Sequence, residues 1–433
     1  MARCPSIANI PAPMCHASKD PPPLLPKSLV PTRNRIEAID VIRGIALCGL
    51  VPMNILDFAF AEDHYFSPGD TTGFSRFLWH VVIIVGSGKF MSLFALLFGA
   101  GIILATQNKE AAGLPVNAYF TKRLAWLAVF GILHAYLIWY GDILVAYAVT
   151  GLIIFWCRHW RPRTLVIVGT LFLGVLPGLI ALLALGLHLS DFDLQAAIDI
   201  DTSTESDDNF EKKANAAFSG SWLRQMPYRA LYAAILQFVG IPFLVFWIAG
   251  GWMLLGIALV KLGFFQGAWP LVRYHRLALI TITSGLAIAT AGHGWDHYHN
   301  WKITAVLTSF PLAYLAMILL ALGYAALIVY WCQSTKDSKR PIQNAFANIG
   351  RMALTNYIGQ SLVLSLLFYG HGLGLRAQLP FPMVLAIVPA IWLGQAFLSS
   401  LWLKFFRFGP LEWIWRCLTY GAKLPNRHAR ASA

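Results

Sequence analysis

The chain has 433 residues, of which 58% are hydrophobic and 12% are charged, and it carries a net charge of +13. Soluble proteins contain about 25% charged residues, so this composition excludes an ordinary water-soluble domain. The apolar residues form long runs, such as 81–105 and 303–330. About 20 apolar residues are enough to carry a helix across the hydrocarbon core of a bilayer. The sequence therefore predicts an all-α, polytopic transmembrane helix bundle.

The chain begins with a proline-rich segment. Residues 1–35 contain eight prolines and no continuous apolar stretch. This excludes a cleavable signal peptide, because such a peptide needs an apolar core. The composition is typical of disordered tails. We expect residues 1–35 to form a disordered cytosolic tail and the basic residues 423–433 to form a second one.

About ten transmembrane helices are predicted between these tails, in a single membrane domain of residues 36–422. Their approximate spans are 37–58, 77–105, 120–140, 142–158, 163–187, 229–261, 275–293, 303–332, 350–370 and 381–405. The longest polar segment, about 188–228, is acidic and is interpreted as an external loop, which could contain a short amphipathic helix. It lacks the calcium-binding loop pattern, so a solvated connector is favoured over a calcium site. Within the span 229–261, Gly240 and Pro242 predict a kink or the end of an interfacial lead-in to the helix.

Lysine and arginine residues are distributed unevenly between the two sides of the predicted bundle. We call the side that holds the N-terminus side A and the opposite side side B. Side A has 24 lysines and arginines and side B has 7. Cytoplasmic loops carry an excess of these residues, so side A is predicted to be cytoplasmic, with both termini on it. The basic net charge is therefore a topology signal, and no nucleic-acid partner is expected.

Ionisable groups inside a bilayer are costly and usually functional. The first predicted helix opens with Asp40 and Arg43, which are three residues apart and can pair. Asn54 lies eleven residues after Arg43, on nearly the same helix face. The alternative to a functional site is a structural anchor at the membrane surface.

The second predicted helix places Lys89 near the middle of the bilayer. A lysine at that depth needs a carboxylate, backbone carbonyls or a ligand anion as its partner. Gly86 and Gly88, beside Lys89, have no side chains and so allow other groups to approach it closely. Gly99 and Gly101 further along predict tight helix packing.

A histidine and an aspartate flank a predicted break between two helices. Gly141 interrupts the helix that carries His134, and Asp142 is placed to cap the next helix. His134 lies within about 12 Å of the break along the helix axis. The two residues can therefore serve as a general base and the group that orients it. The alternative is an N-cap and a packed histidine.

The ninth predicted helix is expected to start at Gly350, on side A. Arg351 lies at that end, while Asn356 and Gln360 are four residues apart and present their amides together. The histidines within 293–299 do not have the spacing of a recognised metal site, so no metal is predicted.

Four segments resemble the YeiB family of bacterial inner-membrane proteins, within residues 35–422. They are Asp40 to Gly44 with Asn54, Lys89 to Gly101, His134 to Leu144 with Tyr147, and Gly350 to Tyr357, and the stretches Gly409–Trp413 and Leu418–Tyr420 fit as well. The resemblance implies a multi-pass protein of the bacterial inner membrane, in contact with membrane lipid.

The YeiB family is similar to a wider group of transmembrane acyltransferases that includes heparan-alpha-glucosaminide N-acetyltransferase. This relatedness implies transfer of an acyl group from cytosolic acyl-CoA to an acceptor, a lipid or a glycan, at the outer face. An asparagine late in the first helix and a histidine shortly after it are catalytic in that acetyltransferase, and Asn54 matches the asparagine. The histidine stays open. His64 fits the spacing from Asn54, His80 fits the spacing to Gly99, and other YeiB-like chains keep the position of His134.

The expected catalytic residues are therefore His134, Asp142 and Asn54, with His64 and His80 as alternative bases. The expected substrate-binding residues are Asp40, Arg43, Lys89, Arg351, Asn356 and Gln360. A transporter or channel for a small anionic substrate is the alternative, because it would use the same buried polar groups. A sensor or scaffold without turnover is a third hypothesis.

Overall fold

The computed structural model describes residues 36–60, 69, 71–190, 194, 205–336, 338 and 340–428. The predicted tail of residues 1–35 and the candidate base His64 lie outside these residues. So do the last five residues of the predicted tail 423–433.

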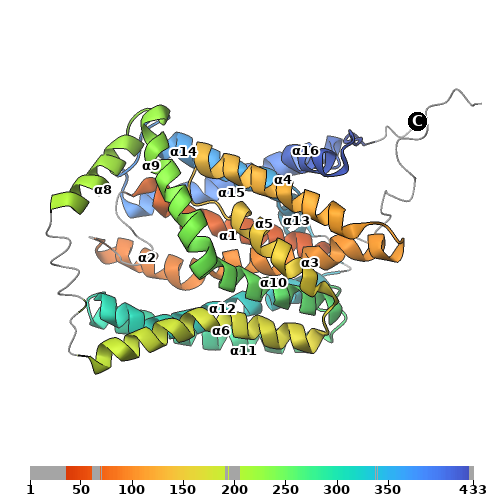
Figure 1. Ribbon diagram of the computed structural model, residues 1–433, viewed down its shortest axis with the longest axis horizontal. Coiled ribbons are helices and arrows are strands. Elements are labelled where there is room, and N and C mark those ends of the chain that lie inside the picture. The colour runs from red at the N-terminus through yellow and green to blue at the C-terminus, as the bar shows by residue number, and fades with distance from the viewer. Residues whose placement is uncertain are drawn as a thin grey trace, which may run out of the picture. The chain divides into compact units, whose positions relative to one another are not determined.

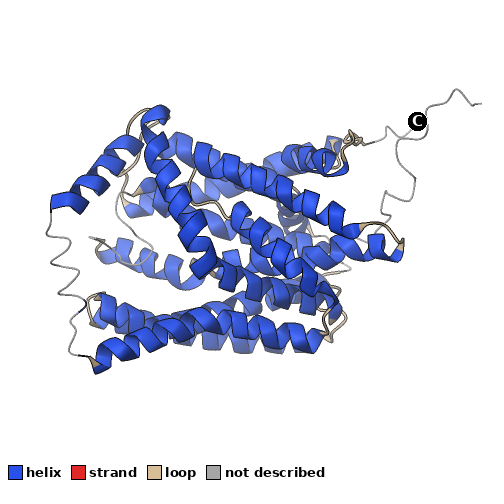
Figure 2. Ribbon diagram, in the orientation of Figure 1, coloured by secondary structure: helices blue, strands red, loops and turns tan. Residues whose placement is uncertain are grey.

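The described residues form helices joined by short connections (Figure 2). In chain order the helices are α1 (Glu37–Ala59), α2 (Gly73–Gly86), α3 (Lys89–Ala111), α4 (Val116–Leu137), α5 (Leu144–Ile154), the 3-10 helix η2 (Phe155–His159), α6 (Pro162–Leu189), α8 (Glu205–Phe218), α9 (Trp222–Ile235), the π-helix η3 (Leu236–Val245), α10 (Phe246–Lys261), α11 (Leu271–Tyr298), α12 (Ile303–Ser334), α13 (Pro341–Arg351), α14 (Ala353–Phe368), α15 (Phe381–Phe405) and α16 (Pro410–Tyr420). The prediction of an all-α fold is confirmed.

Seven helical segments of the described chain are long and apolar enough to cross a membrane. They are Glu37–Ala59, Gly73–Ala111, Pro162–Leu189, Trp222–Lys261, Leu271–Tyr298, Ile303–Ser334 and Phe381–Phe405. Two shorter apolar segments, Leu144–His159 and Ala353–Phe368, coincide with two further predicted spans. The number ten and the orientation of the termini stay predictions.

Helix α1 is the most enclosed of these segments. In its apolar window 78% of the residues are buried, compared with 22% in α6 and in α15. It packs against α13, α3, α14, α12 and α15 (Figure 1). The apolar side chains of α6 and α15, by contrast, are largely exposed, as expected for helices that face lipid. Residues on α1 are therefore placed to contact several other helices at once.

Glycines bring α3 and α10 into backbone contact. A Cβ atom at Gly99 would lie 2.0 Å from the Met253 carbonyl oxygen, and one at Gly256 would lie 1.9 Å from that of Leu96. Small residues at such a crossing are a common feature of membrane helix packing. The prediction of tight packing is confirmed at Gly99 and is wrong at Gly101, where a Cβ atom would meet nothing within 4 Å.

Two predicted helix boundaries were wrong. The span 77–105 is two helices, because the chain breaks at Ser87 and at Gly88, whose φ of 74° is left-handed. Gly350 does not start the ninth predicted helix, since Gly350 and Arg351 end α13 and α14 begins at Ala353. Between α9 and α10, Gly240 and Pro242 lie within the π-helical turns of η3, and the helix continues.

Candidate functional site

The candidate site is built around the connection between α4 and α5. Helix α4 ends at Leu137, three residues after His134, and α5 begins at Leu144. The carboxylate of Asp142 accepts a hydrogen bond from the Val145 amide at 2.9 Å, which satisfies one of the free donors at the start of α5. Gly131 allows this turn to rest on α4, because a Cβ atom there would lie 2.8 Å from Asp142 Oδ2.

His134 and Asp142 are in direct contact. His134 Nδ1 lies 2.9 Å from Asp142 Oδ1, and the two residues are 1% and 5% exposed. An ionised carboxylate can only accept hydrogen bonds, so the proton of the neutral imidazole belongs on Nδ1. His134 Nε2 is buried and has no hydrogen-bond partner among the described residues. The pair therefore presents an unused basic nitrogen in a buried environment.

Aromatic side chains enclose this pair. The ring centroid of Tyr357, on α14, lies 5.0 Å from that of His134, and the Tyr357 hydroxyl accepts a hydrogen bond from the Ile143 amide at 3.3 Å. The ring of Trp139 lies 6.2 Å from His134. Tyr147, on α5, donates to the Met91 carbonyl at 2.7 Å, which ties α5 to the first turn of α3.

Asp57 holds the chain that follows His134, and the sequence analysis did not identify it. Its carboxylate accepts hydrogen bonds from Trp139 Nε1 and from the Tyr140 hydroxyl, each at 2.5 Å. Arg376 donates to the carbonyl oxygens of Asp57 and Phe58 at 2.7 and 2.9 Å, at the end of α1. The sequence did contain a signal for Asp57. It is an acidic residue inside the first predicted transmembrane helix, and acidic residues at such positions are rare and usually functional.

Arg229 holds the end of α4, and it too was absent from the predicted site. This arginine of α9 is 0% exposed and donates to the Leu137 carbonyl at 3.1 Å and to Gln225 Oε1 at 2.5 Å. Trp222 Nε1 donates to the same carbonyl at 2.9 Å. These bonds satisfy a carbonyl that the end of a helix leaves without an intrahelical partner. Gln225 Nε2 in turn lies 3.1 Å from Nδ1 of His371. His371 lies outside the spanning segments, and burial lowers the pKa of this histidine.

Asp40 and Arg43 form the predicted pair at the start of α1, with 3.1 Å between Arg43 NH1 and Asp40 Oδ1. Arg43 NH1 also reaches the carbonyl of Gly350 at 3.5 Å. A Cβ atom at Gly350 would lie 2.0 Å from the Asp40 carbonyl oxygen, so α1 and α13 touch there. Arg351, the next residue, contacts Asn348 Oδ1 at 3.4 Å. The two predicted anion-binding arginines therefore lie at one helix crossing.

Asn356 and Gln360 are buried and bond to neighbouring helices. Asn356 Nδ2 donates to Ser399 Oγ at 2.9 Å, and Gln360 Nε2 donates to the Leu47 carbonyl at 3.2 Å and to Gln395 Oε1 at 3.1 Å. These contacts join α14 to α1 and α15. Their predicted role in substrate binding stays a prediction, and their present contacts are those of helix packing.

Glu412, on α16, binds the start of α14. Its carboxylate accepts hydrogen bonds from the amides of Leu354 and Thr355, at 2.6 and 3.0 Å, and from the Thr355 hydroxyl at 2.6 Å. Burial raises the pKa of Glu412, and these hydrogen bonds oppose that rise. Helix α16 is therefore fixed to the helix that carries Tyr357.

Asn54 and His80 make no hydrogen bond or ring contact with His134 or Asp142 among the described residues. Asn54, one turn before Asp57 on α1, is partly buried and has no side-chain hydrogen bond to the described residues. His80 lies on α2, where its ring contacts Trp79, His293, His297 and Trp301.

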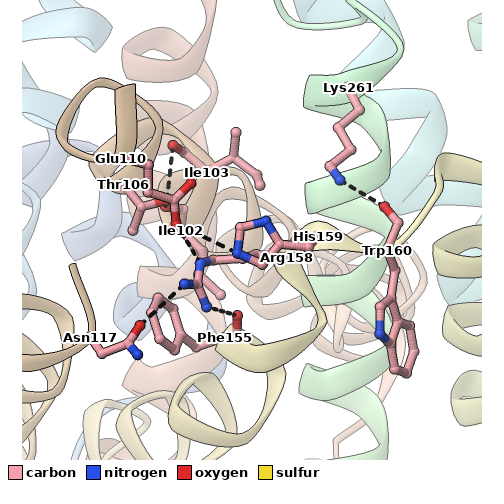
Figure 3. A network of polar contacts seen from close by, with 10 residues as sticks. All are labelled: Ile102, Ile103, Thr106, Glu110, Asn117, Phe155, Arg158, His159, Trp160 and Lys261. Carbon is pink, nitrogen blue, oxygen red and sulfur yellow. Dashed lines mark hydrogen bonds and ion pairs between the residues drawn. The ribbon is translucent and has the colours of Figure 1, made fainter. Parts of the chain in front are cut away.

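A second polar network ties the ends of α3, α4 and η2 on the predicted side A (Figure 3). Arg158 donates to Glu110 Oε1 at 2.7 Å and to Asn117 Oδ1 at 3.2 Å, and Lys261 donates to the Trp160 carbonyl at 2.7 Å. Figure 3 shows that Arg158 points between Glu110 and Asn117. These contacts satisfy the charged groups locally, so the network fits an anchoring role.

Comparison with known proteins places the chain in a family. Residues 259–422 match a family model described as "Protein of unknown function (DUF418)". The chain is 32% identical over 393 residues to "Uncharacterized protein YeiB" of Escherichia coli (strain K12), covering 89% of this chain and 97% of the relative. It is 29% identical over 416 residues to "Uncharacterized protein YxaH" of Bacillus subtilis (strain 168), covering 90% and 95%. With its apolar helices and its buried polar pair, the chain belongs to the YeiB family, as its sequence motifs predicted.

Proposed function

We propose that the protein is a membrane-embedded acyltransferase of the bacterial inner membrane. It would move an acyl group from cytosolic acyl-CoA to a lipid or glycan acceptor at the outer face. The observation that carries this proposal is the buried contact of 2.9 Å between His134 and Asp142, which leaves Nε2 of the histidine without a partner among the described residues. A histidine oriented in this way is a common general base in acyl transfer.

The proposed step uses His134 Nε2 as the base. Nε2 removes the proton from the acceptor's hydroxyl or amine while the acceptor atom attacks the carbonyl carbon of the thioester. The carbon–sulfur bond breaks, and the proton passes from Nε2 to the leaving sulfur, which departs as the free thiol of coenzyme A. Asp142 stabilises the protonated imidazole between these events. Asn54 is the proposed donor to the oxyanion.

Charge and shape at the predicted cytoplasmic side support binding of the donor there. Arg43 and Arg351 lie at the crossing of α1 and α13, where they can attract phosphate groups. An apolar cavity of about 500 Å³ lies between α1, α3 and α12, lined by Ile45, Phe90, Tyr324, Leu327, Ile328, Tyr330 and Trp331. An acyl chain fits such a lining. The same distribution of Lys and Arg supports side A as the cytoplasmic side.

A transporter for a small anionic substrate is the second candidate function. The break between α2 and α3 at Gly88 supports it, because discontinuous helices often form substrate sites in transporters.

The acyltransferase proposal is tested with radiolabelled acetyl-CoA supplied to inside-out membrane vesicles, followed by extraction of lipid and glycan. Labelled product from the wild type, with turnover roughly 10²–10⁴-fold lower in His134→Ala, is the expected result. Arg43→Ala should instead weaken acyl-CoA binding and leave turnover at saturation largely unchanged. If acyl-CoA neither binds to the wild type nor is consumed with any acceptor mixture, the proposal fails and the transport hypothesis takes its place. Full turnover in His134→Ala, with loss in His64→Ala or His80→Ala, would reject His134 as the base.

A further inference from the structure

The break between α2 and α3 places the start of a helix inside an apolar segment. Helix α2 ends at Gly86 and α3 begins at Lys89, although 73–111 is one of the seven segments long and apolar enough to cross a membrane. The first amides of a helix have no intrahelical acceptor and carry a partial positive charge. In water this end would be solvated. Here Phe90 packs against Gly49 of α1, and Gly88 packs against Met317 of α12.

Lys89 adds a full positive charge at the same point. It is 5% exposed, and its Nζ donates to the Ile83 carbonyl at 3.1 Å. No carboxylate pairs with it among the described residues. Lys89 was expected to need a carboxylate, backbone carbonyls or a ligand anion as its partner, and the structure provides one backbone carbonyl. An ammonium group has three donors, and a buried charge without a counter-charge is costly. The site thus combines a helix start and a lysine, both positive.

Aromatic and histidine side chains of α2, of α11 and of the turn after α11 form a cluster next to Ile83, whose carbonyl binds Lys89. The ring centroid of His80 lies 6.0 Å from that of His293 and 6.0 Å from that of His297. Trp79 packs 5.9 Å from His293 and 5.1 Å from Trp301. His297 is exposed and His80 is partly exposed, so the cluster opens toward the predicted outer face. No group of metal-binding side chains with suitable geometry occurs in the described part of the chain.

Two buried polar atoms of α11 and α12 that can donate a hydrogen bond have no hydrogen-bond partner among the described residues. They are His293 Nδ1 and the Tyr314 hydroxyl. The ring of His293 lies 5.9 Å from that of Trp79, which is one helical turn before Ile83, the residue whose carbonyl accepts from Lys89. Tyr314 lies one turn before Met317, whose sulfur would lie 2.5 Å from a Cβ atom at Gly88. His293 Nδ1 and the Tyr314 hydroxyl can donate a hydrogen bond, whereas Asp296 Oδ1 on α11, which also lacks a partner among the described residues, is an acceptor when ionised. A buried donor without a partner costs about 1–3 kcal/mol, so a ligand that accepts hydrogen bonds would satisfy both.

We propose that this cluster is a binding site for a small anionic group, a phosphate or a carboxylate, that enters from side B. Lys89 provides the charge, the start of α3 provides backbone amides, and His293 and Tyr314 provide further donors. All of these groups favour an acceptor with negative charge. The site contains neither His134 nor Asp142, so it does not depend on the proposed acyl transfer.

The test measures the unfolding temperature of the full-length protein in nanodiscs of neutral lipid, with sodium phosphate or sodium acetate added at constant ionic strength. The wild type should show a saturable rise with at least one of the two anions, and Lys89→Met should weaken the fitted affinity roughly 10- to 100-fold, as loss of a charge-assisted hydrogen bond does. Lys302→Met removes an exposed lysine on the same side and is the matched control, with the wild-type affinity expected.

Two further arms make the result decisive. Nanodiscs with anionic phosphatidylglycerol distinguish a lipid headgroup from a free anion as the ligand. If a headgroup occupies the site, the wild type should start at a higher unfolding temperature and should not respond to free anions. The difference in unfolding temperature between the wild type and Lys89→Met should remain. His293→Leu leaves Lys89 in place and should also weaken the affinity, which covers the case in which Lys89→Met does not fold. The proposal is overturned if no anion or anionic lipid has a saturable effect, if Lys302→Met loses as much as Lys89→Met, or if His293→Leu and Lys89→Met both bind like the wild type.

Discussion

The carboxylate of Asp57 accepts a hydrogen bond from Trp139 Nε1, and this contact joins the end of α1 to the segment that directly follows His134. Tyr140 donates to the same carboxylate. The residues between His134 and Asp142 are thus fixed to a different helix, and the eight-residue separation of the pair closes into a contact of 2.9 Å.

Asp57→Asn should therefore reduce activity through the position of His134. Asparagine carries no charge and has an amino group in place of one carboxylate oxygen, so neither Trp139 nor Tyr140 keeps a hydrogen bond to a charged acceptor. We expect turnover to fall while acyl-CoA binding persists, and the unfolding temperature to fall because a hydrogen bond to a charged group contributes about 1.5–3 kcal/mol. Asn54→Ala, one turn earlier, is the control for the unfolding temperature alone, because Asn54 is itself proposed to act in catalysis, and we expect it to unfold at the wild-type temperature. An Asp57→Asn protein with normal stability and normal turnover would show that the contact does not position the pair.

Two substitutions of Asp142 should distinguish its contact with His134 from its contact with the Val145 amide. Asp142→Asn keeps an oxygen that can accept from the Val145 amide and loses the negative charge beside His134, whereas Asp142→Ala loses both contacts. We expect both variants to lose turnover and only Asp142→Ala to lose about 0.5–2 kcal/mol of stability, the usual effect of removing an N-terminal cap. Acetyl transfer and thermal unfolding measure the two effects. Equal stability of the two variants would contradict a capping role.

The glycine contact between α3 and α10 gives a prediction with an internal control. Gly256→Ala places a Cβ atom 1.9 Å from the Leu96 carbonyl oxygen, so the helices must move apart, and we expect a loss of about 1–3 kcal/mol. Gly101→Ala lies on α3 with open space around it and should be neutral or stabilising, because alanine favours a helix more than glycine does. Thermal unfolding in detergent compares the two variants. A neutral Gly256→Ala would mean that the two helices do not approach so closely.

The orientation in the membrane can be tested with single cysteines. We expect Ser338→Cys, between α12 and α13, to be protected from an impermeant maleimide in intact cells, and Ser206→Cys, in the acidic segment, to be labelled once the outer barrier is permeabilised. The reason is the excess of Lys and Arg on side A. The parent chain for this experiment needs its six native cysteines replaced. Labelling at residue 338 without labelling at residue 206 would reverse the assignment.

The sequence predicted the helices well because apolar runs report directly on lipid or core contact. It predicted the neighbouring pair His134 and Asp142 because both lie at one helix break. The break at Gly88 was missed, since glycine also occurs inside membrane helices and apolar residues continue on both sides of it. Asp57 and Arg229 were missed for a different reason. Trp139 lies 82 residues from Asp57, and Leu137 lies 92 residues from Arg229, and no local pattern reports such a contact.

The bond between Glu412 and the start of α14 makes the last helix of the described chain part of the frame around His134. Glu412 holds the amides of Leu354 and Thr355, and two residues later α14 carries Tyr357 against the histidine ring. A chain that stops before residue 410 would expose those amides without an acceptor and free the helix end nearest the pair. A chain that stops after residue 422 would keep them bound. We therefore expect the contact between α16 and α14 to help hold Tyr357 in place. A change that separates α16 from α14 would be transmitted to His134 through α14 alone.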